Sequence, residues 1–379
     1  MHTGESTVID VGGLDALIAE VARRGYTAIG PVVRDGAVTV GPVADSSDLP
    51  CGWGDRQGPG RYRLESGRGD ALFDWAVGPA SWKPEFFPPH ETIWRATVDG
   101  GGVTVQDLDR CAAPVAIIGA RPCDLAALGI LDRVLAGGAT PDPGYVQRRA
   151  AAVVIAVECG APSASCFCTS MGTGPGATGG FDLALTELGT GDGHRFLVRT
   201  GSDAGVQLID AVPHRPVAAG DDDERQRVLA RASDRISRTL DTQGLPALLG
   251  RNLEHPRWAD VADRCLSCGN CTLVCPTCFC SDVDDVSSLT GDVERHRSWA
   301  SCFDLVHSYI HGGPVRPTTS SRYRQWLTHK LSTWWDQFDS SGCVGCGRCI
   351  TWCPVGIDLT EEAAAVRATD GAVVGGHRD

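Results

Sequence analysis

The sequence predicts an α+β protein in which an N-terminal mixed α/β domain precedes a mostly helical, cysteine-rich domain. Short apolar runs alternate with segments of helical apolar spacing through the first half of the 379-residue chain. A long charged segment ends near residue 240, and two cysteine runs of identical spacing follow, separated by a long insertion. We therefore expect one domain over residues 1–245 and a second over residues 246–379.

The first predicted elements are a helix and an antiparallel strand pair. Residues 14–22 carry apolar side chains at helical spacing, whereas 26–33 and 37–43 have strand-like composition on either side of an Arg-Asp-Gly turn. Residues 49–62 are rich in glycine, proline and aromatic side chains. Regular structure in that stretch is therefore expected to be short.

A strand-helix-strand unit is predicted in the middle of the first domain. Residues 114–119 and 151–157 are continuous apolar runs typical of buried strands, and 125–135 is amphipathic. Four cysteines follow the ends of these two strands: Cys123, Cys159, Cys166 and Cys168. Because open α/β sheets build their sites outside the carboxyl ends of their strands, we expect the four cysteines to converge.

The remaining elements complete the two predicted domains. Residues 181–187 and 195–199 are typical of strands. Residues 221–240 predict a long helix, and its acidic first residues suit a helix N-terminus. A short helix is expected over 258–263 and an aromatic-rich helix over 323–338.

The two cysteine runs carry the strongest chemical signal in the chain. Each reads C-x2-C-x2-C-x3-C-P, which in two-cluster ferredoxins wraps three thiolates around one cube and sends the fourth to the other. By that rule, one [4Fe-4S] cluster is held by Cys265, Cys268, Cys271 and Cys353. The other cluster is held by Cys343, Cys346, Cys349 and Cys275. The second domain is therefore predicted to be a two-cluster ferredoxin-like domain with a long insertion.

Zinc sites and disulfides are the alternatives for these runs. Structural zinc sites pair C-x2-C knuckles with four ligands per ion, which is not the spacing found here. Disulfides require export, and residues 1–10 are polar and acidic, without the apolar run of a signal peptide. Seventeen cysteines without an export signal indicate metal ligation in a reducing compartment, so we expect a cytoplasmic protein.

The earlier group of Cys123, Cys159, Cys166 and Cys168 lacks ferredoxin spacing. Soft thiolate ligands suit both iron–sulfur clusters and zinc, and buried thiols without metal are a third interpretation. We favour a third [4Fe-4S] cluster at this group.

Five cysteines lie outside these three groups. Cys51 and Cys111 have no neighbour at ligand spacing and are expected to be ordinary small side chains. Cys278, Cys280 and Cys302 lie in the insertion, close in sequence to the first run. Replacement of a crossing ligand, tuning of a cluster through weak S–H hydrogen bonds, and plain burial are all open for these three.

Composition and missing motifs exclude several function classes. A net charge of −13, from 47 acidic and 34 basic residues, argues against nucleic acid as a partner. No apolar run approaches the length of a membrane span, so no membrane partner is expected. No G-x-G-x-x-G follows a predicted strand, and neither a nucleophile–base constellation nor a nickel-type pair of C-x2-C motifs occurs. No catalytic residues are therefore expected, and substrate chemistry belongs to other subunits.

Three motifs together carry a family resemblance. They are CPTCFC at 275–280, SGCVGCGRC at 341–349 and CFCTSMGTGP at 166–175, with RPCDL at 121–125 in support. With these motifs the chain resembles the iron–sulfur β subunit of cytoplasmic NADP-linked [NiFe]-hydrogenases, the sulfhydrogenases. The A subunit of anaerobic sulfite reductase is related to that family. The resemblance extends from about residue 80 to about residue 360.

The resemblance implies an electron-transfer subunit within an oxidoreductase complex. In that family, the β subunit connects the hydrogenase small subunit, which accompanies the large subunit with the NiFe centre, to a γ subunit that binds FAD and NADP. The eight cysteines of the paired runs match as cluster ligands, and the earlier group of four matches as an additional set. The alternatives are an electron-transfer subunit of a sulfite or polysulfide reductase and a stand-alone iron–sulfur regulatory or structural protein.

Overall fold

The structure is a computed structural model, and it describes residues 1–99, 101–106, 113–289 and 291–371. Cys111, which the sequence predicts to be an ordinary side chain, lies outside these residues. The described part contains no helix that is both long and apolar enough to cross a membrane.

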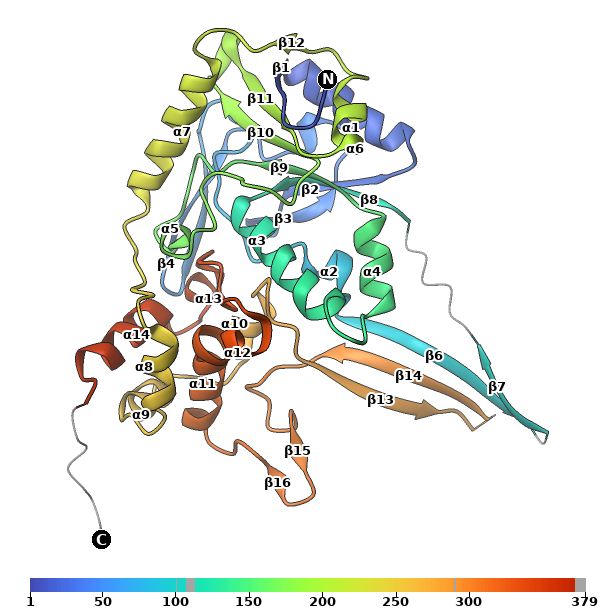
Figure 1. Ribbon diagram of the computed structural model, residues 1–379, viewed down its shortest axis with the longest axis vertical. Helices are drawn as coiled ribbons and strands as arrows, with labels where there is room; N and C mark the ends of the chain where they lie inside the picture. The colour runs from blue at the N-terminus through green and yellow to red at the C-terminus, as the bar shows by residue number, and fades with distance from the viewer. Residues whose placement is uncertain (100, 107–112, 290, 372–379) are drawn as a thin grey trace.

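The upper half of the molecule in Figure 1 is an eight-stranded mixed sheet. In order across the sheet, its strands are β12 (Arg215–Pro216), β1 (Ser6–Asp10), β11 (Arg195–Thr200), β10 (Leu183–Leu188), β9 (Val153–Val157), β8 (Val115–Ala120), β2 (Thr27–Arg34) and β3 (Ala37–Pro42). The four central strands β2, β8, β9 and β10 are parallel, and the outer strands are antiparallel to their neighbours.

Helices cover both faces of this sheet, which is why its central strands are apolar on both sides. The helices α1 (Val11–Arg23) and α6 (Asp203–Ile209) pack on the face that includes Ile155. The helices α2 (Lys83–Phe86), α3 (Pro122–Leu131) and α4 (Pro143–Ala150) pack on the opposite face, which includes Val154. As predicted, β8, α3 and β9 form a strand-helix-strand unit with parallel strands.

The glycine- and proline-rich stretch contains more regular structure than expected. It forms a hairpin of two six-residue strands, β4 (Trp53–Gly58) and β5 (Arg61–Ser66). Gly60 makes the turn with a φ of 66°, and its N–H donates to the Ile350 carbonyl at 3.1 Å. The Tyr62 ring stacks on Trp352, with centroids 5.1 Å apart. The hairpin therefore packs against the second cysteine run.

The lower half is mainly helical around an aromatic core. Its longer helices are α8 (Leu245–Arg251), α9 (Arg257–Ala262), α11 (Thr319–Thr328), α12 (Trp334–Phe338) and α14 (Leu359–Ala368). Trp258, Tyr323 and Trp326 are buried together among them. Phe167, from the N-terminal half, packs into the same core. A domain boundary at residue 245 remains a prediction.

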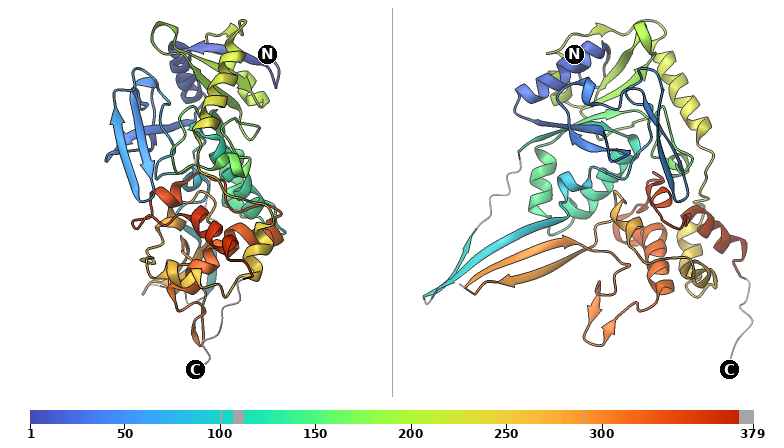
Figure 2. Two further views of the ribbon diagram at one scale, coloured as in Figure 1. Left: turned by 90° about the vertical axis from the view of Figure 1, so that its left-hand side faces the viewer. Right: turned by 180° about the vertical axis from the view of Figure 1, so that it is seen from behind.

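The insertion between the cysteine runs departs from the mostly helical domain that the sequence predicts. It contributes two strands to a sheet. β13 (Ser281–Ser287) and β14 (Asp292–Trp299) pair with β6 (His90–Asp99) and β7 (Gly102–Gln106) in a four-stranded antiparallel sheet. This sheet projects from the body in Figure 1 and, seen from behind, in Figure 2. Arg297 of β14 bonds to both Glu91 and Asp142, which ties the sheet to the N-terminal half.

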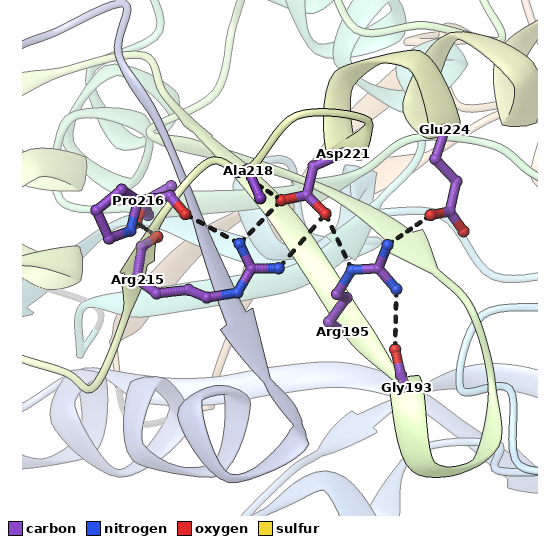
Figure 3. A network of polar contacts seen from close by, with 8 residues as sticks. Gly193, Arg195, Arg215, Pro216, Ala218, Asp221 and Glu224 are labelled. Carbon is purple, nitrogen blue, oxygen red and sulfur yellow. Dashed lines mark hydrogen bonds and ion pairs between the residues drawn. The ribbon is translucent and has the colours of Figure 1, made fainter.

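The helix α7 (Asp221–Arg235) descends along one edge of the molecule from the sheet toward the helical half (Figure 1). It ends five residues before the predicted limit of 240. At its start, the buried Asp221 accepts from Arg215 at 2.9 Å and from Arg195 at 3.1 Å (Figure 3). The bonds from Arg215 chiefly hold the pKa of Asp221 well below its usual range. This carboxylate therefore fixes the helix start to β11 and β12.

Candidate metal centres

Three groups of four cysteines gather in the folded chain. Site 1 denotes Cys265, Cys268, Cys271 and Cys353; site 2 denotes Cys275, Cys343, Cys346 and Cys349; site 3 denotes Cys123, Cys159, Cys166 and Cys168. The groups are those that the sequence predicts as ligand sets.

Site 1 surrounds a small apolar cavity. All four of its cysteines line the cavity, together with Phe303, Tyr323 and Trp326. The backbone N–H of Ser267 donates to Cys265 Sγ at 3.4 Å, and that of Ile357 donates to Cys353 Sγ at 3.3 Å. Backbone donors to cysteine sulfur are among the features that set cluster potentials, so the environment of these thiols fits a cluster.

Site 2 joins Cys275 of the first run to three cysteines of the second. Burial chiefly raises the pKa of Cys343 to about 12, with smaller contributions from the neighbouring Cys346 and Cys275 thiols, while the nearby Lys330 ammonium opposes the shift. The Gly345 N–H donates to Cys343 Sγ at 3.5 Å. The geometry thus brings the fourth cysteine of the first run to the second run.

Site 3 lies outside the carboxyl ends of β8 and β9, where the sequence predicts it. Its four cysteines line one apolar cavity together with Arg121, Pro175 and Cys346. Burial chiefly raises the pKa of both Cys166 and Cys168 to about 12. Because metals and clusters bind the thiolate, ligation here has to displace protons from the sulfurs. The four thiols and the apolar lining of their cavity suit a metal group that prefers soft sulfur ligands.

Arg121 and Glu158 hold the two strand ends in place around site 3. Arg121 is 1% exposed, and its guanidinium donates to the carbonyls of Phe73, Trp75 and Glu158 at 2.8–3.0 Å. The Glu158 carboxylate accepts from Arg199 at 2.8 Å and from Arg225 of α7 at 2.7 Å. These contacts fix the loops that carry the cysteines.

Site 2 lies between the other two sites. Cys349 of site 2 also lines the cavity of site 1, and Cys346 of site 2 also lines the cavity of site 3. The three sites therefore form a row, with site 2 in the middle.

The close approach of sites 2 and 3 depends on two glycines. A Cβ on Gly345 would lie 2.7 Å from the Phe167 backbone, and one on Gly347 would lie 2.4 Å from the Ser165 carbonyl oxygen. Both glycines have positive φ, at 66° and 76°. The Phe167 N–H also donates to the Gly345 carbonyl at 2.8 Å. The glycines of SGCVGCGRC thus let one cysteine loop lie on the other.

Two buried cations contact site 2, and sequence reasoning missed both. Lys330 Nζ donates to Cys275 Sγ at 3.3 Å and is 3% exposed as a residue. The Arg348 guanidinium pairs with Asp124 at 2.9 Å and lies against Cys346. Arg348 stands inside the second run, and Lys330 is a cation in an aromatic-rich helical segment. A lysine among the aromatic residues of this predicted helix is the feature of the sequence that could have pointed to a buried charge.

The remaining cysteines fall outside the three groups. Cys51 is exposed. The Cys278 thiol lies beside Cys275, and the Cys280 thiol lies beside Cys302. None of these four thiols lines the cavity of site 1 or site 3. Within residues 1–99, 101–106, 113–289 and 291–371, no group of three His, Cys, Asp or Glu side chains is arranged to hold a single metal ion.

Comparison with known proteins identifies the family. Residues 264–357 match the family model for a 4Fe-4S dicluster domain. Sulfhydrogenase 2 subunit beta of Pyrococcus furiosus is 32% identical over 293 residues, which cover 75% of this chain and 82% of that protein. No solved structure matches the chain. The shared identity extends well beyond the dicluster segment, so this chain belongs to the family of sulfhydrogenase β subunits, iron–sulfur proteins of an oxidoreductase complex.

Proposed function

We propose that this chain is the electron-transfer subunit of a multi-subunit [NiFe]-hydrogenase. The observation that carries the proposal is the row of three cysteine sites, in which site 2 shares lining residues with both neighbours. A row of redox groups suits passage of electrons through the protein, whereas a structural cluster needs no second or third group beside it.

The proposed cofactors are three [4Fe-4S] clusters, one at each site. Such clusters, when bound, take up and release single electrons at potentials set by their surroundings. Sites 1 and 2 supply the crossed ligand sets of a two-cluster ferredoxin, and site 3 supplies four thiols in one apolar cavity. At site 3, an apolar lining surrounds the buried thiols of Cys123, Cys166 and Cys168.

Site 1 is proposed as the end of the row at which a partner docks. Cys268 is exposed, whereas the Cys275 and Cys346 residues of site 2 are buried. Leu266 and Leu273, on either side of Cys268 in the first run, are 64% and 46% exposed. Exposed apolar side chains at the rim of a site are typical of surfaces that a partner protein covers.

The proposed partners are the hydrogenase small and large subunits at one end and an FAD- and NADP-binding γ subunit at the other. Support comes from the name of the Pyrococcus furiosus relative, a subunit of a sulfhydrogenase. A flavin suits the γ subunit because it converts the two-electron chemistry of NADP into one-electron steps. We place the complex in the cytoplasm. A sulfite or polysulfide reductase would use the same three sites with a different partner.

Purification without oxygen tests the proposal. The isolated chain should contain about twelve iron atoms, because each [4Fe-4S] cluster carries four, and should show paramagnetic signals after reduction. Hydrogenase subunits should co-purify from the native cytosol. A chain that binds iron but stays redox-silent would be a structural iron–sulfur protein. Co-purification with a reductase of sulfite would replace the hydrogenase assignment.

Single cysteine replacements test the ligand sets. Cys268→Ser, Cys346→Ser and Cys123→Ser should each lower the iron content by up to one cluster's worth. Cys51→Ser is the matched control, because Cys51 is exposed and lies outside all three sites. Unchanged iron in any of the first three variants would refute that site.

A further inference from the structure

We propose that Lys330 raises the reduction potential of the cluster at site 2 and so makes the middle of the row the preferred resting place of an electron. The inference rests on the proposed function, because it assumes a [4Fe-4S] cluster held by the site 2 cysteines. It assigns a role to a side chain that belongs to none of the three ligand sets.

The contacts of Lys330 place its ammonium group against a proposed ligand sulfur. Nζ donates to Cys275 Sγ at 3.3 Å, to Thr277 Oγ1 at 3.1 Å and to the Gly342 carbonyl at 3.0 Å. These three acceptors use the three N–H bonds of an ammonium group. None of the three is a carboxylate, so its positive charge acts on the sulfur without a neutralising partner among them.

The backbone around Lys330 supports a functional role. Lys330 lies in the π-helical segment His329–Thr333, which separates α11 from α12. Such segments are rare within helices and occur frequently at functional sites. Here three successive residues of the segment, 330–332, are buried together. The wider turn therefore lets the chain bury a lysine toward site 2 while Leu331 packs in the core.

The charge changes the redox equilibrium for a simple reason. A [4Fe-4S] cube with four thiolates is negatively charged and becomes more negative on reduction. A nearby positive charge therefore favours the reduced form, and the effect is strong where water is excluded. Hydrogen bonds to the cluster sulfurs act in the same direction. Lys330 supplies both the charge and the hydrogen bond at one sulfur.

The other buried cations near site 2 have a less direct effect on the charge of its ligand sulfurs. Arg348 is paired with Asp124, which offsets its charge. Lys83 donates to the backbone carbonyl of Cys278 at 3.0 Å, and its Nζ lies 3.6 Å from the centre of the Trp299 ring. Lys83 is as buried as Lys330 but has no hydrogen bond to a proposed ligand sulfur. It is therefore the matched control.

The test is a redox titration of the whole chain, followed by electron paramagnetic resonance. The site 2 signal is identified as the component lost in Cys349→Ser. Lys330→Gln should shift the ratio of oxidised to reduced site 2 cluster at least tenfold toward the oxidised form. For one electron, this corresponds to a fall of 59 mV or more in the reduction potential of the cluster. Lys330→Arg should stay close to the wild type, and Lys83→Gln should shift the ratio less. Iron per chain is measured in every variant.

Three results would overturn the inference while leaving the proposed function standing. One is full iron in Lys330→Gln with an unchanged site 2 potential. Another is an equal shift in Lys83→Gln, which would make the sulfur contact irrelevant. A third is loss of the site 2 cluster from Lys330→Gln and Lys330→Met alike, which would make the lysine a folding element. Absence of the site 2 cluster from the wild type would instead remove the proposed function itself.

Discussion

His194 is held by two carboxylates in the sheet half of the molecule. Its Nε2 lies 2.8 Å from Glu187, which also accepts from the N–H groups of Leu72 and Phe73, and Asp70 lies 3.9 Å from Nδ1. The hydrogen bond with Glu187 chiefly raises the pKa of His194 above its usual 6.5. Because the folded protein holds this proton more tightly than the unfolded chain, the resulting stability is complete below pH 6.5 and is lost as the pH rises through the folded pKa.

We therefore expect His194→Gln to flatten the pH dependence of stability. Above pH 6.5 the melting temperature of the wild type should fall relative to that of the variant. Anaerobic thermal melts between pH 6 and pH 9 measure this difference at a pH range that does not strip iron from thiolates. If the melting temperatures of the two proteins changed with pH in parallel, the Glu187 contact would not be what stabilises the protonated form of His194.

The contact between the second cysteine run and residues 165–168 depends on the lack of a side chain at Gly347. Gly347→Ala should separate the second cysteine run from residues 165–168, because its Cβ has no room beside the Ser165 carbonyl. We expect about 1–3 kcal/mol of strain at this positive-φ position and loss of iron from site 3. Gly179→Ala is the control, since a Cβ there meets no atom within 4 Å. Equal iron in both variants would show that the two loops do not depend on each other.

Arg297 tests whether the projecting sheet is anchored as the contacts indicate. Arg297→Ala leaves the carboxylate of Asp142 without its ion-pair partner, whereas Glu91 keeps Arg148 at 2.9 Å, and all of these side chains are largely buried. Removing one member of such a group costs about 3 kcal/mol. Hydrogen exchange should therefore rise along β6 and β14.

Arg295→Ala is the matched control for the projecting sheet. Arg295 pairs with Asp285 at the surface, and exposed pairs of this kind contribute little. Exchange in β6 and β14 should stay near the wild-type level in this variant. The same increase in both variants would mean that the sheet opens regardless of its anchor.

Removal of iron should act on the whole helical half. The proposed ligands Cys265, Cys271 and Cys353 pack against its aromatic core, so loss of a cluster withdraws support from that core. Anaerobic reduction with a chelator should lower the melting temperature and the helical circular dichroism while leaving the strand signal of the eight-stranded sheet. Melting that is unchanged after full loss of iron would contradict this coupling.

Local patterns in the sequence predicted the central strands, the helix between β8 and β9, and the convergence of Cys123 with Cys159, because each depends on apolar spacing or on the edge at which parallel strands end. They did not predict that β14 pairs with β6. That pairing joins residues 90–99 to residues 292–299 across about half of the chain, and no turn or spacing in the sequence indicates it. The role of Gly347 was hidden for the same reason, since only the folded chain shows what the glycine touches.

The interlocking of distant segments has a consequence for how the protein is made. Site 1 is completed by Cys353, and the cavity of site 3 is lined in part by Cys346, so both sites need residues of the second cysteine run. All eight strands of the large sheet come from residues 6–216 and are synthesised before that run. Under the proposed cluster assignment, iron and sulfide therefore have to be delivered after the second cysteine run has been synthesised, and a cell that is short of iron at that point would accumulate chains with a formed sheet and a loose helical half.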